Sequence, residues 1–498
     1  MTRPFALSVA PVLAACLVAC GPPKERPVGI PPAAAPHAAV DVDEDEDEDD
    51  FGDEADEPAE APAAPALDPW MVEAAAKITA HAKGKTRAWE RLATMADRFG
   101  HRLSGSKALE DAIDWTVERM REDGLDNARR EKVMVPHWVR GAESLTVTAP
   151  VKRELTILGL GMSVGTRGTL SGEVAVVDTV DAIAGQGDAL AGKIVLINQV
   201  MPPYDHAKRD SGYGPTVQAR TRGASEAAKV GAKAVLVRSV SAVSLDTPHT
   251  GSLRYADGVK KIPAAAVTHE GASFIARMVG RGDTVRVAMK MGAKMLPDAP
   301  SANAIAELRG REKPEEIVVI GGHIDSWDVG DGSSDDGAGC MMAMEAALML
   351  KELGLVPRRT IRVVLFTNEE NGLRGGKAYF EAHGKEPHVG AIEADSGSGK
   401  ATGVGIKTSD EALLAKLTGY APLFTGLGAD QITAGWGGAD ISPLTDAGVL
   451  SMSVRPDASH YFDLHHSPAD TIDKIDPAAL QANAAVMALM AYLVAEAE

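Results

Sequence analysis

Short apolar runs alternate with longer helical stretches from residue 300 to the end of the chain. Four of these runs have the length and composition of buried strands, at 317–320, 361–366, 388–394 and 449–454. The stretch 340–353 is apolar nearly all round a helical period, as is typical of a helix that covers a parallel sheet. The alternation predicts a three-layer α/β domain whose sheet is mixed and mostly parallel.

Acidic or imidazole side chains follow each of these predicted strands. Ligands of open α/β sheets bind outside the carboxyl ends of the strands, so side chains at these ends are expected to converge. The first cluster lies in GGHIDSWDVGDGSSDDGAG at 321–339, which has the residue types of a cation site. The candidate residues are His323, Asp325, Asp335 and Asp336 after the first run, Glu369 and Glu370 after the second, Asp395 after the third, and His465 and His466 after the fourth.

The pattern of apolar and polar residues changes between residues 135 and 291. Strand-like runs at 145–148, 172–177, 193–197 and 234–240 are separated by Gly, Pro and Asp, with a helical stretch at 223–230. No pair of potential ligands has a useful spacing here. We predict an independent β-rich domain over 135–291, inserted into a domain formed by 68–134 and 292–498, whose role is to shape access to the site. Its phrases GKIVLIN, GASEAAKVGAKAVLVRSV, PHTG and KIPAAAV resemble a protease-associated domain.

The N-terminal residues predict export. Residues 1–20 combine one early Arg with an apolar core too short for a permanent membrane span, which indicates a signal peptide. Leu17-Val18-Ala19-Cys20 resembles the bacterial lipoprotein cleavage box, so Cys20 is expected to become the lipid-modified first residue. An ordinary signal peptide cut nearby is the alternative. Because Gly21 stands where Asp would favour inner-membrane retention, we expect an outer-membrane anchor and a periplasmic or cell-surface protein.

Residues 21–67 predict a disordered linker. The segment is rich in Pro and Ala, and 41–57 holds thirteen carboxylates and no base, in a chain whose net charge is −19. Like charges at this density repel one another and keep a chain extended. Calcium binding is the alternative, but no glycine-punctuated loop gathers these carboxylates around one ion. We expect a stand-off linker, and no nucleic-acid partner.

The cysteines predict a fold without an internal disulfide. Only Cys20 and Cys340 of the three remain after processing, and the first is expected to be acylated. Cys340 lies in the apolar run CMMAMEAALML, which favours a core residue over a nucleophile. An exported protein of this kind depends on its apolar core alone for stability.

Five motifs carry a resemblance to a known family. They are GGHIDSWDVG…DDGAG, FTNEENGLRGGKAYF, EADSG, DISPLTDAGV and YFDLHHSPADT, in this order. Together they resemble the co-catalytic two-zinc peptidases of the aminopeptidase and glutamate carboxypeptidase class. The phrases SVGT and PHTG, the inserted domain and GGHIDSWDVG are most similar to the plasma glutamate carboxypeptidase branch, and the likeness runs from about residue 85 to 485.

The resemblance implies two zinc ions in each subunit, with Co²⁺ or Mn²⁺ as possible substitutes. His323 and Asp395 would hold one ion, Glu370 and His466 the other, and Asp335 would bridge them, beside a cis peptide bond. Two close cations need a bridging carboxylate, and a donor set of N and O atoms without a thiolate suits zinc. The ligand charge of −3 against +4 leaves the centre slightly positive.

Further roles are implied for the residues around the ligands. Glu369 is expected to be the general base, although chemistry alone allows Glu369 and Glu370 to exchange roles. Asp325 is expected to fix the ring and tautomer of His323 through its carboxylate, with direct ligation as the alternative. Of the pair His465 and His466, the resemblance implies that His466 is the ligand, because it immediately precedes Ser467. Asp336 is expected to cap the following helix, and Asp440, Tyr461 and His465 are candidates for contacting the substrate.

Three functions follow from this reading. The first is an exopeptidase of the plasma glutamate carboxypeptidase type that hydrolyses short peptides, with dipeptides expected first, by metal-activated water and a Glu base. The second is an aminopeptidase of the same superfamily. The third is a catalytically silent binding module, against which the presence of all five ligands and the base argues. The resemblance also implies a homodimer.

Overall fold

The computed structural model describes residues 67–84 and 87–497. The signal peptide predicted over 1–20, the lipidation of Cys20 and nearly all of the linker predicted over 21–67 lie outside the described residues. These three features therefore stay predictions.

The first of two eight-stranded sheets contains the four predicted strands of the C-terminal region. It is mixed, with β12, β11, β13 and β16 running parallel to one another and β1, β10 and β14 joining antiparallel. β15 pairs parallel to β14 at the far edge. The order across the sheet is β1 (Asp126–Val139), β10 (Lys294–Leu308), β12 (Arg359–Phe366), β11 (Lys313–His323), β13 (His388–Glu393), β16 (Ser451–Pro456), β14 (Ala401–Lys407) and β15 (Gln431–Ala434).

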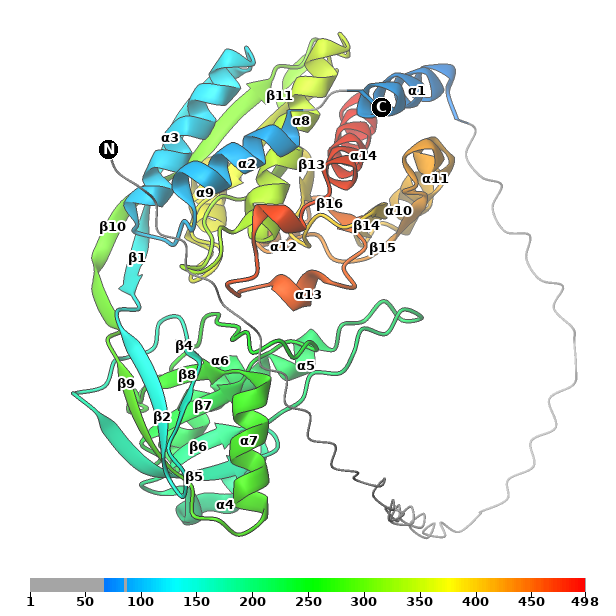
Figure 1. Cartoon of the computed structure of the whole chain (residues 1–498). Helices are drawn as coiled ribbons and strands as arrows, with labels where there is room; N and C mark the ends of the chain where they lie inside the picture. The colour runs from blue at the N-terminus through cyan, green and yellow to red at the C-terminus, as the bar shows by residue number, and fades with distance from the viewer. Residues whose placement is uncertain (1–66, 85–86, 498) are drawn as a thin grey trace, which may run out of the picture. The chain divides into compact units, whose positions relative to one another are not determined.

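Helices cover both faces of this sheet, which confirms the predicted α/β class. On one face, α8 and α14 pack against each other and share a core with α1, α2 and α3 (Figure 1). On the other face, Tyr379 of α9 and Leu444 of α12 pack on Ile305, Val319 and Phe366. The helices are α1 (Pro69–Ala82), α2 (Ala88–Phe99), α3 (Lys107–Glu122), α8 (Ala338–Glu352), α9 (Arg374–His383), α10 (Glu411–Thr418), α11 (Ala421–Phe424), α12 (Ser442–Asp446), α13 (Tyr461–Leu464) and α14 (Pro477–Glu496).

The two central helices are buried nearly all round. α8 confirms the helix predicted over 340–353, and Cys340 is fully buried, with its Sγ donating to the carbonyl of His323 at 3.1 Å. α14 alone among the described helices is long and apolar enough to cross a membrane, with a mean hydropathy of 1.6. Because 89% of that window is buried inside the protein, α14 serves as a core helix.

The second sheet is formed by residues between β1 and β10. Its order is β3 (Arg153–Leu155), β2 (Glu143–Ala149), β9 (Arg286–Met291), β5 (Leu170–Val177), β6 (Ile194–Ile197), β7 (Ala234–Arg238), β8 (Ala264–Val267) and β4 (Ile157–Gly159). α6 (Gln218–Lys229) packs in the core on one face, and α7 (His269–Gly280) in the core on the other. The short helices α4 (Ala182–Gln186) and α5 (Tyr213–Thr216) complete this region.

The strands predicted at 145–148, 172–177, 193–197 and 234–240 correspond to β2, β5, β6 and β7, and the helix at 223–230 lies within α6. The expected boundary at 134/135 falls inside β1, which continues to Val139. The assignment of this region to the protease-associated class, and its limits as a domain, stay predictions.

His383 ties α9 to β1 through ion pairs that depend on pH. Its Nε2 lies 2.8 Å from Glu131 and its Nδ1 lies 3.1 Å from Glu386. The hydrogen bond to Glu131 raises the pKa of His383, and burial opposes this rise only in part. Because the folded pKa is the higher one, the stabilisation is complete below the unfolded value of about 6.5 and is lost as the pH rises through the folded value.

We therefore expect His383→Gln to lower the free energy of unfolding by up to about 1 kcal/mol at about pH 5.5, and by little at about pH 9. Urea denaturation at the two pH values measures the difference. His101→Gln, at an exposed histidine, serves as the control and is expected to be neutral at both. Equal destabilisation by His383→Gln at both pH values would show that the ion pairs contribute nothing.

Candidate metal centre

The parallel register brings the four strand ends to one edge of the first sheet. His323, the last residue of β11, pairs with Phe366, the last residue of β12. On the other side, Glu393 at the end of β13 pairs with Gly321 of β11 and with Ser453 of β16. The loops that follow these strands therefore leave from neighbouring points, although their residues are far apart in the chain.

The five side chains predicted as ligands come together at this edge. His323 Nε2 lies 3.2 Å from Asp335 Oδ1 and 3.7 Å from Asp395 Oδ1. His466 Nε2 lies 3.2 Å from Asp335 Oδ2 and 3.0 Å from Glu370 Oε2. Asp335 thus presents one carboxylate oxygen to each of two imidazole–carboxylate halves.

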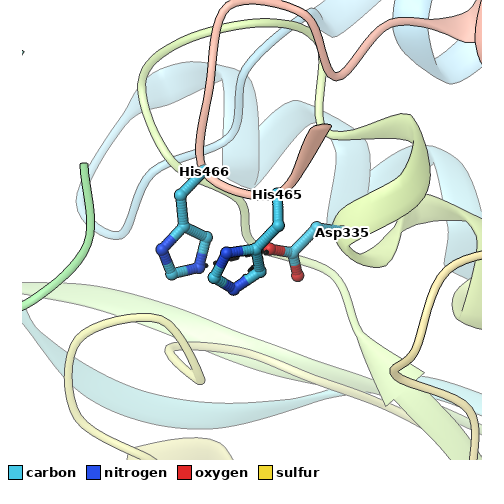
Figure 2. Close-up of side chains that lie close together, drawn as sticks. All are labelled: Asp335, His465 and His466. Carbon is cyan, nitrogen blue, oxygen red and sulfur yellow. Dashed lines mark ion pairs between the residues drawn. The ribbon is translucent and has the colours of Figure 1, made fainter. Parts of the chain in front are cut away.

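His465 also belongs to the cluster. Its ring stacks on that of His466 with the centroids 3.5 Å apart, and its Nε2 lies 3.7 Å from Asp335 Oδ2. Figure 2 shows both rings beside the Asp335 carboxylate. Two groups have ligand atoms close enough to share an ion, namely His323, Asp335 and Asp395, and Asp335, His465 and His466. His466 rather than His465 approaches Glu370, in line with the ligand implied by the sequence.

The backbone that carries Asp335 is held by two other aspartates. Asp335 lies in the turn Ser333–Gly337 that leads into α8, where Asp335 and Asp336 have non-helical backbone angles, and the bond between them is cis, as the resemblance implied. Asp470 accepts the backbone N–H groups of Ser334 at 2.7 Å and of Asp335 at 3.1 Å. Asp336 accepts from the N–H groups of Gly339 and His323, each at 3.0 Å, so it caps the start of α8 as expected.

Asp325 does not contact His323 in the predicted way. His323 Nδ1 lies 3.0 Å from the backbone carbonyl of Asp325 but 3.7 Å from its carboxylate, so the carbonyl is the hydrogen-bond acceptor. The carboxylate is engaged elsewhere, because it accepts the N–H of Glu369 at 3.0 Å and of Glu370 at 3.4 Å. Asp325 therefore orients the ring through its main chain and the Glu369–Glu370 turn through its side chain.

Burial and like charge dominate the electrostatics of the cluster. Burial raises the pKa of Glu370 and Glu369, and nearby carboxylates raise both further. Burial lowers the pKa of His323 in part, but Asp325, Asp335 and Asp395 raise it overall. Burial, with the charge of Asp335, raises the pKa of Asp470 to about 7. These carboxylates repel one another unless positive charge lies between them.

The donor set fits a divalent cation. Glu370 Oε1 is buried, and no hydrogen-bond donor reaches it from the residues that the structure describes. Buried charge of this kind is stable when it is paired or coordinates a metal. Imidazole nitrogens and carboxylate oxygens are the ligands of zinc sites that lack thiolate.

The three candidates for substrate contact lie at different depths. Tyr461 Oη donates to Asp395 Oδ1 at 3.5 Å, which places the phenol at the cluster. His465 also lies at the cluster, through its contact with Asp335. Asp440 contacts the end of β13, where its N–H donates to Glu393 Oε1 at 3.4 Å. Burial and the charge of Glu393 raise the pKa of Asp440, and both its carboxylate oxygens lack a donor among the described residues.

The second-sheet region reaches the cluster, which sequence analysis missed. Thr250 N–H donates to the carbonyl of His466 at 2.9 Å, and His249 Nδ1 lies 2.7 Å from the carbonyl of His465. Arg220 of α6 lies 3.3 Å from His466 Nδ1. The PHTG phrase at 248–251 was a signal for the first two contacts, whereas no pattern marks Arg220 or Asp470.

Comparison with known proteins identifies the family of the chain. The model of Peptidase family M28 matches residues 303–491. Carboxypeptidase Q of Mus musculus is 42% identical over 429 residues, covering 86% of this chain and 89% of that protein, and carboxypeptidase Q of Homo sapiens is 41% identical over 431 residues with the same coverage. A Peptidase M28 precursor from Shewanella amazonensis superposes with a TM-score of 0.82 at 35% identity, over 86% of this chain and 97% of that chain.

Fold and site together define a metallo-exopeptidase. The chain belongs to peptidase family M28, among the relatives of carboxypeptidase Q, which is another name for plasma glutamate carboxypeptidase. A zinc aminopeptidase from Bacillus subtilis, at 20% identity and a TM-score of 0.60 over 81% of this chain and 94% of that chain, shares the fold. The family and the enzyme class predicted from the motifs are confirmed.

Gly339 permits the close approach of α8 to the end of β13. A Cβ atom at this position would lie 1.9 Å from the carbonyl oxygen of Ala394, next to Asp395. We expect Gly339→Ala to lower the free energy of unfolding by about 1–3 kcal/mol, because the helix must move away from the sheet. Gly185→Ala in α4, where a Cβ meets nothing within 4 Å, is the control. Chemical denaturation measures both variants, and equal stabilities would contradict the expected clash.

Proposed function

We propose that the protein is a zinc-dependent exopeptidase that hydrolyses short peptides, dipeptides first, at a centre of two Zn²⁺ ions. The observation that carries the proposal is the position of Asp335, whose two oxygens face His323 on one side and His466 on the other at 3.2 Å each. A carboxylate between two imidazole–carboxylate halves is the arrangement that two close cations require.

The ligands divide into two halves. His323 and Asp395 would hold one ion, Glu370 and His466 the other, and Asp335 would bridge both. When bound, the ions polarise the scissile carbonyl and lower the pKa of a water molecule. The N and O donor set supports zinc, with Co²⁺ or Mn²⁺ as possible substitutes.

Glu369 is the proposed general base. Its carboxylate would accept a proton from the attacking water and deliver it to the nitrogen of the leaving amine. Asp325 supports this role, because its carboxylate accepts the N–H of Glu369 at 3.0 Å and so fixes the backbone from which the base projects. Bound cations would offset the repulsion by Asp395 and Glu370 that contributes to raising the pKa of Glu369. Positive charge close to the carboxylate would favour its basic form.

A cavity lies next to the cluster, and none of the five predicted ligands lines it. It has a volume of about 270 Å³ and is lined by Ser396–Lys400, which follow Asp395, and by Tyr461 and Leu464 of α13. Ligand pockets for drug-sized molecules begin at about 300 Å³. A cavity of this size suits a small ligand rather than a folded chain.

A substrate panel tests the proposal. The zinc-loaded enzyme is assayed on free dipeptides and on their N-acetylated and C-amidated versions, before and after removal of zinc with a chelator. We expect cleavage only where both ends are free, loss of activity on chelation and recovery with Zn²⁺. Activity that survives amidation but not acetylation would indicate an aminopeptidase. Activity that survives removal of the ions would disprove the metal mechanism, and absence of all cleavage would favour a silent binding module.

Glu369→Gln separates the base from the ligands. The variant is expected to keep the zinc content of the wild type, because the amide leaves the five ligands in place. We expect its turnover to fall by about 10²–10⁴-fold, the contribution of a positioned general base. Glu381→Gln, at an exposed glutamate of α9, is the matched control. Zinc analysis and kcat on a free dipeptide measure both, and an unchanged kcat would remove Glu369 from the mechanism.

We further propose a lipid anchor on Cys20, in the outer membrane, and a homodimer. Leu17–Cys20 and the Pro-rich linker after it support the anchor, which would hold the enzyme at a membrane surface without a spanning helix. Cys20→Ser is expected to move the protein from the membrane fraction to the soluble fraction. The variant is expected to keep its peptidase activity. Fractionation followed by the peptidase assay checks this, and unchanged membrane association would disprove the anchor.

A further inference from the structure

Arg220 approaches the metal centre from the second-sheet region. The side chain is only 6% exposed, and its Nη1 lies 3.3 Å from Nδ1 of His466. Nη1 also donates to the carbonyl of Thr250 at 3.1 Å, and Nη2 donates to Tyr213 Oη at 2.6 Å. Within the described part of the chain, the polar partners of this guanidinium are Thr250, Tyr213 and His466, none of which is a carboxylate. A buried positive charge therefore faces the far side of a predicted metal ligand.

Close packing keeps the guanidinium in this place. A Cβ atom at Gly251 would lie 2.3 Å from Cζ of Arg220, so the glycine of the PHTG phrase leaves the space that the guanidinium fills. The preceding Thr250 donates its N–H to the carbonyl of His466 at 2.9 Å. The same short loop thus fixes both Arg220 and the backbone of the histidine.

The two imidazoles of the centre differ in the partner of Nδ1. A neutral imidazole carries one ring hydrogen, so an Nε2 that coordinates a cation requires the hydrogen on Nδ1. His323 meets this requirement, because its Nδ1 faces the carbonyl oxygen of Asp325 at 3.0 Å, which can only accept. His466 does not, because its Nδ1 faces a guanidinium, which can only donate.

Cation binding by His466 therefore has two costs that His323 avoids. The hydrogen bond between Arg220 and Nδ1 must break when Nδ1 becomes a donor, and the positive guanidinium repels the incoming ion. Metal-binding histidines ordinarily donate this hydrogen to a carbonyl or a carboxylate. The chain has this ordinary arrangement at only one of the two halves.

We infer that Arg220 weakens the metal position formed by His466 and Glu370, so that the position formed by His323 and Asp395 binds the first and tighter ion. The inference rests on the proposed two-zinc function and adds an order of occupation to it. Arg220 acts through His466 and is a positioning residue. The second-sheet region thereby sets the affinity of one half of the centre.

Stepwise removal of zinc tests the inference. The full-chain, zinc-loaded protein is titrated with a competing chelator of known affinity, and released zinc is measured against free zinc. The wild type is expected to release its two ions in separate steps. His466→Ala is expected to abolish the weaker step, and His323→Ala the tighter one.

Arg220→Gln supplies the decisive variant, because its amide oxygen can accept the hydrogen of Nδ1 and its charge is zero. We expect it to tighten the weaker step by about 10–100-fold, the range of outer partners of metal ligands, and to leave the tighter step unchanged. Arg220→Lys keeps the charge and is expected to retain the wild-type difference. Arg220→Met repeats the test without a polar group if Arg220→Gln does not fold. Arg238→Gln, at a half-buried arginine of β7 that contacts Asn198 and Ser273, is the control for folding.

The outcomes distinguish failure of the inference about Arg220 from failure of the proposed two-zinc function. If the zinc affinity of the weaker step is unchanged or lower in both Arg220→Gln and Arg220→Met, the proposed role of Arg220 is overturned, although two zinc ions still bind. Loss of the tighter step in His466→Ala would overturn the assigned order. Failure of the wild type and every variant to bind two ions would overturn the two-zinc centre itself, and the inference with it.

Discussion

The register of four parallel strands is the constraint on which the site depends. β11 lies between β12 and β13, and β16 follows β13, so the loops that carry the ligands leave one edge of one sheet. Because these strands are buried on both faces, shifting any of them by one residue would exchange its side chains between the two cores and move its loop. The apolar cores around α8 and on the opposite face, which hold this register, therefore also hold the geometry of the metal centre.

The cost of gathering buried carboxylates explains much of the surrounding structure. Backbone N–H groups compensate part of the charge, at Asp470 from the loop of Asp335 and at Asp325 from the Glu369–Glu370 turn. The remaining charge lies on oxygens such as Glu370 Oε1, which have no donor within the described residues. Divalent cations are the natural counter-charge, so metal binding and the stability of this edge are linked.

The second-sheet region contributes more than a cover over the site. Its PHTG loop binds the main chain of both His465 and His466, and Arg220 contacts the ring of His466. The carboxypeptidase Q relatives match 86% of the chain, a span that includes residues of both sheets. Residues around both sheets therefore build the centre. The half with His323 and Asp395 depends on the first sheet, whereas the half with His466 is also held by the second-sheet region.

Local pattern determined the elements and the strand-end clusters of this protein. Apolar periodicity marks α8 and the strands that end at His323 and Phe366, because the period of a buried element is written in consecutive residues. Motif resemblance gave the family and a predicted set of ligands. Tertiary structure alone decided that the carbonyl rather than the carboxylate of Asp325 faces His323, and that Asp470 and Arg220 reach the centre. These contacts join residues distant in the chain or depend on main-chain direction, and neither property leaves a trace in side-chain periodicity.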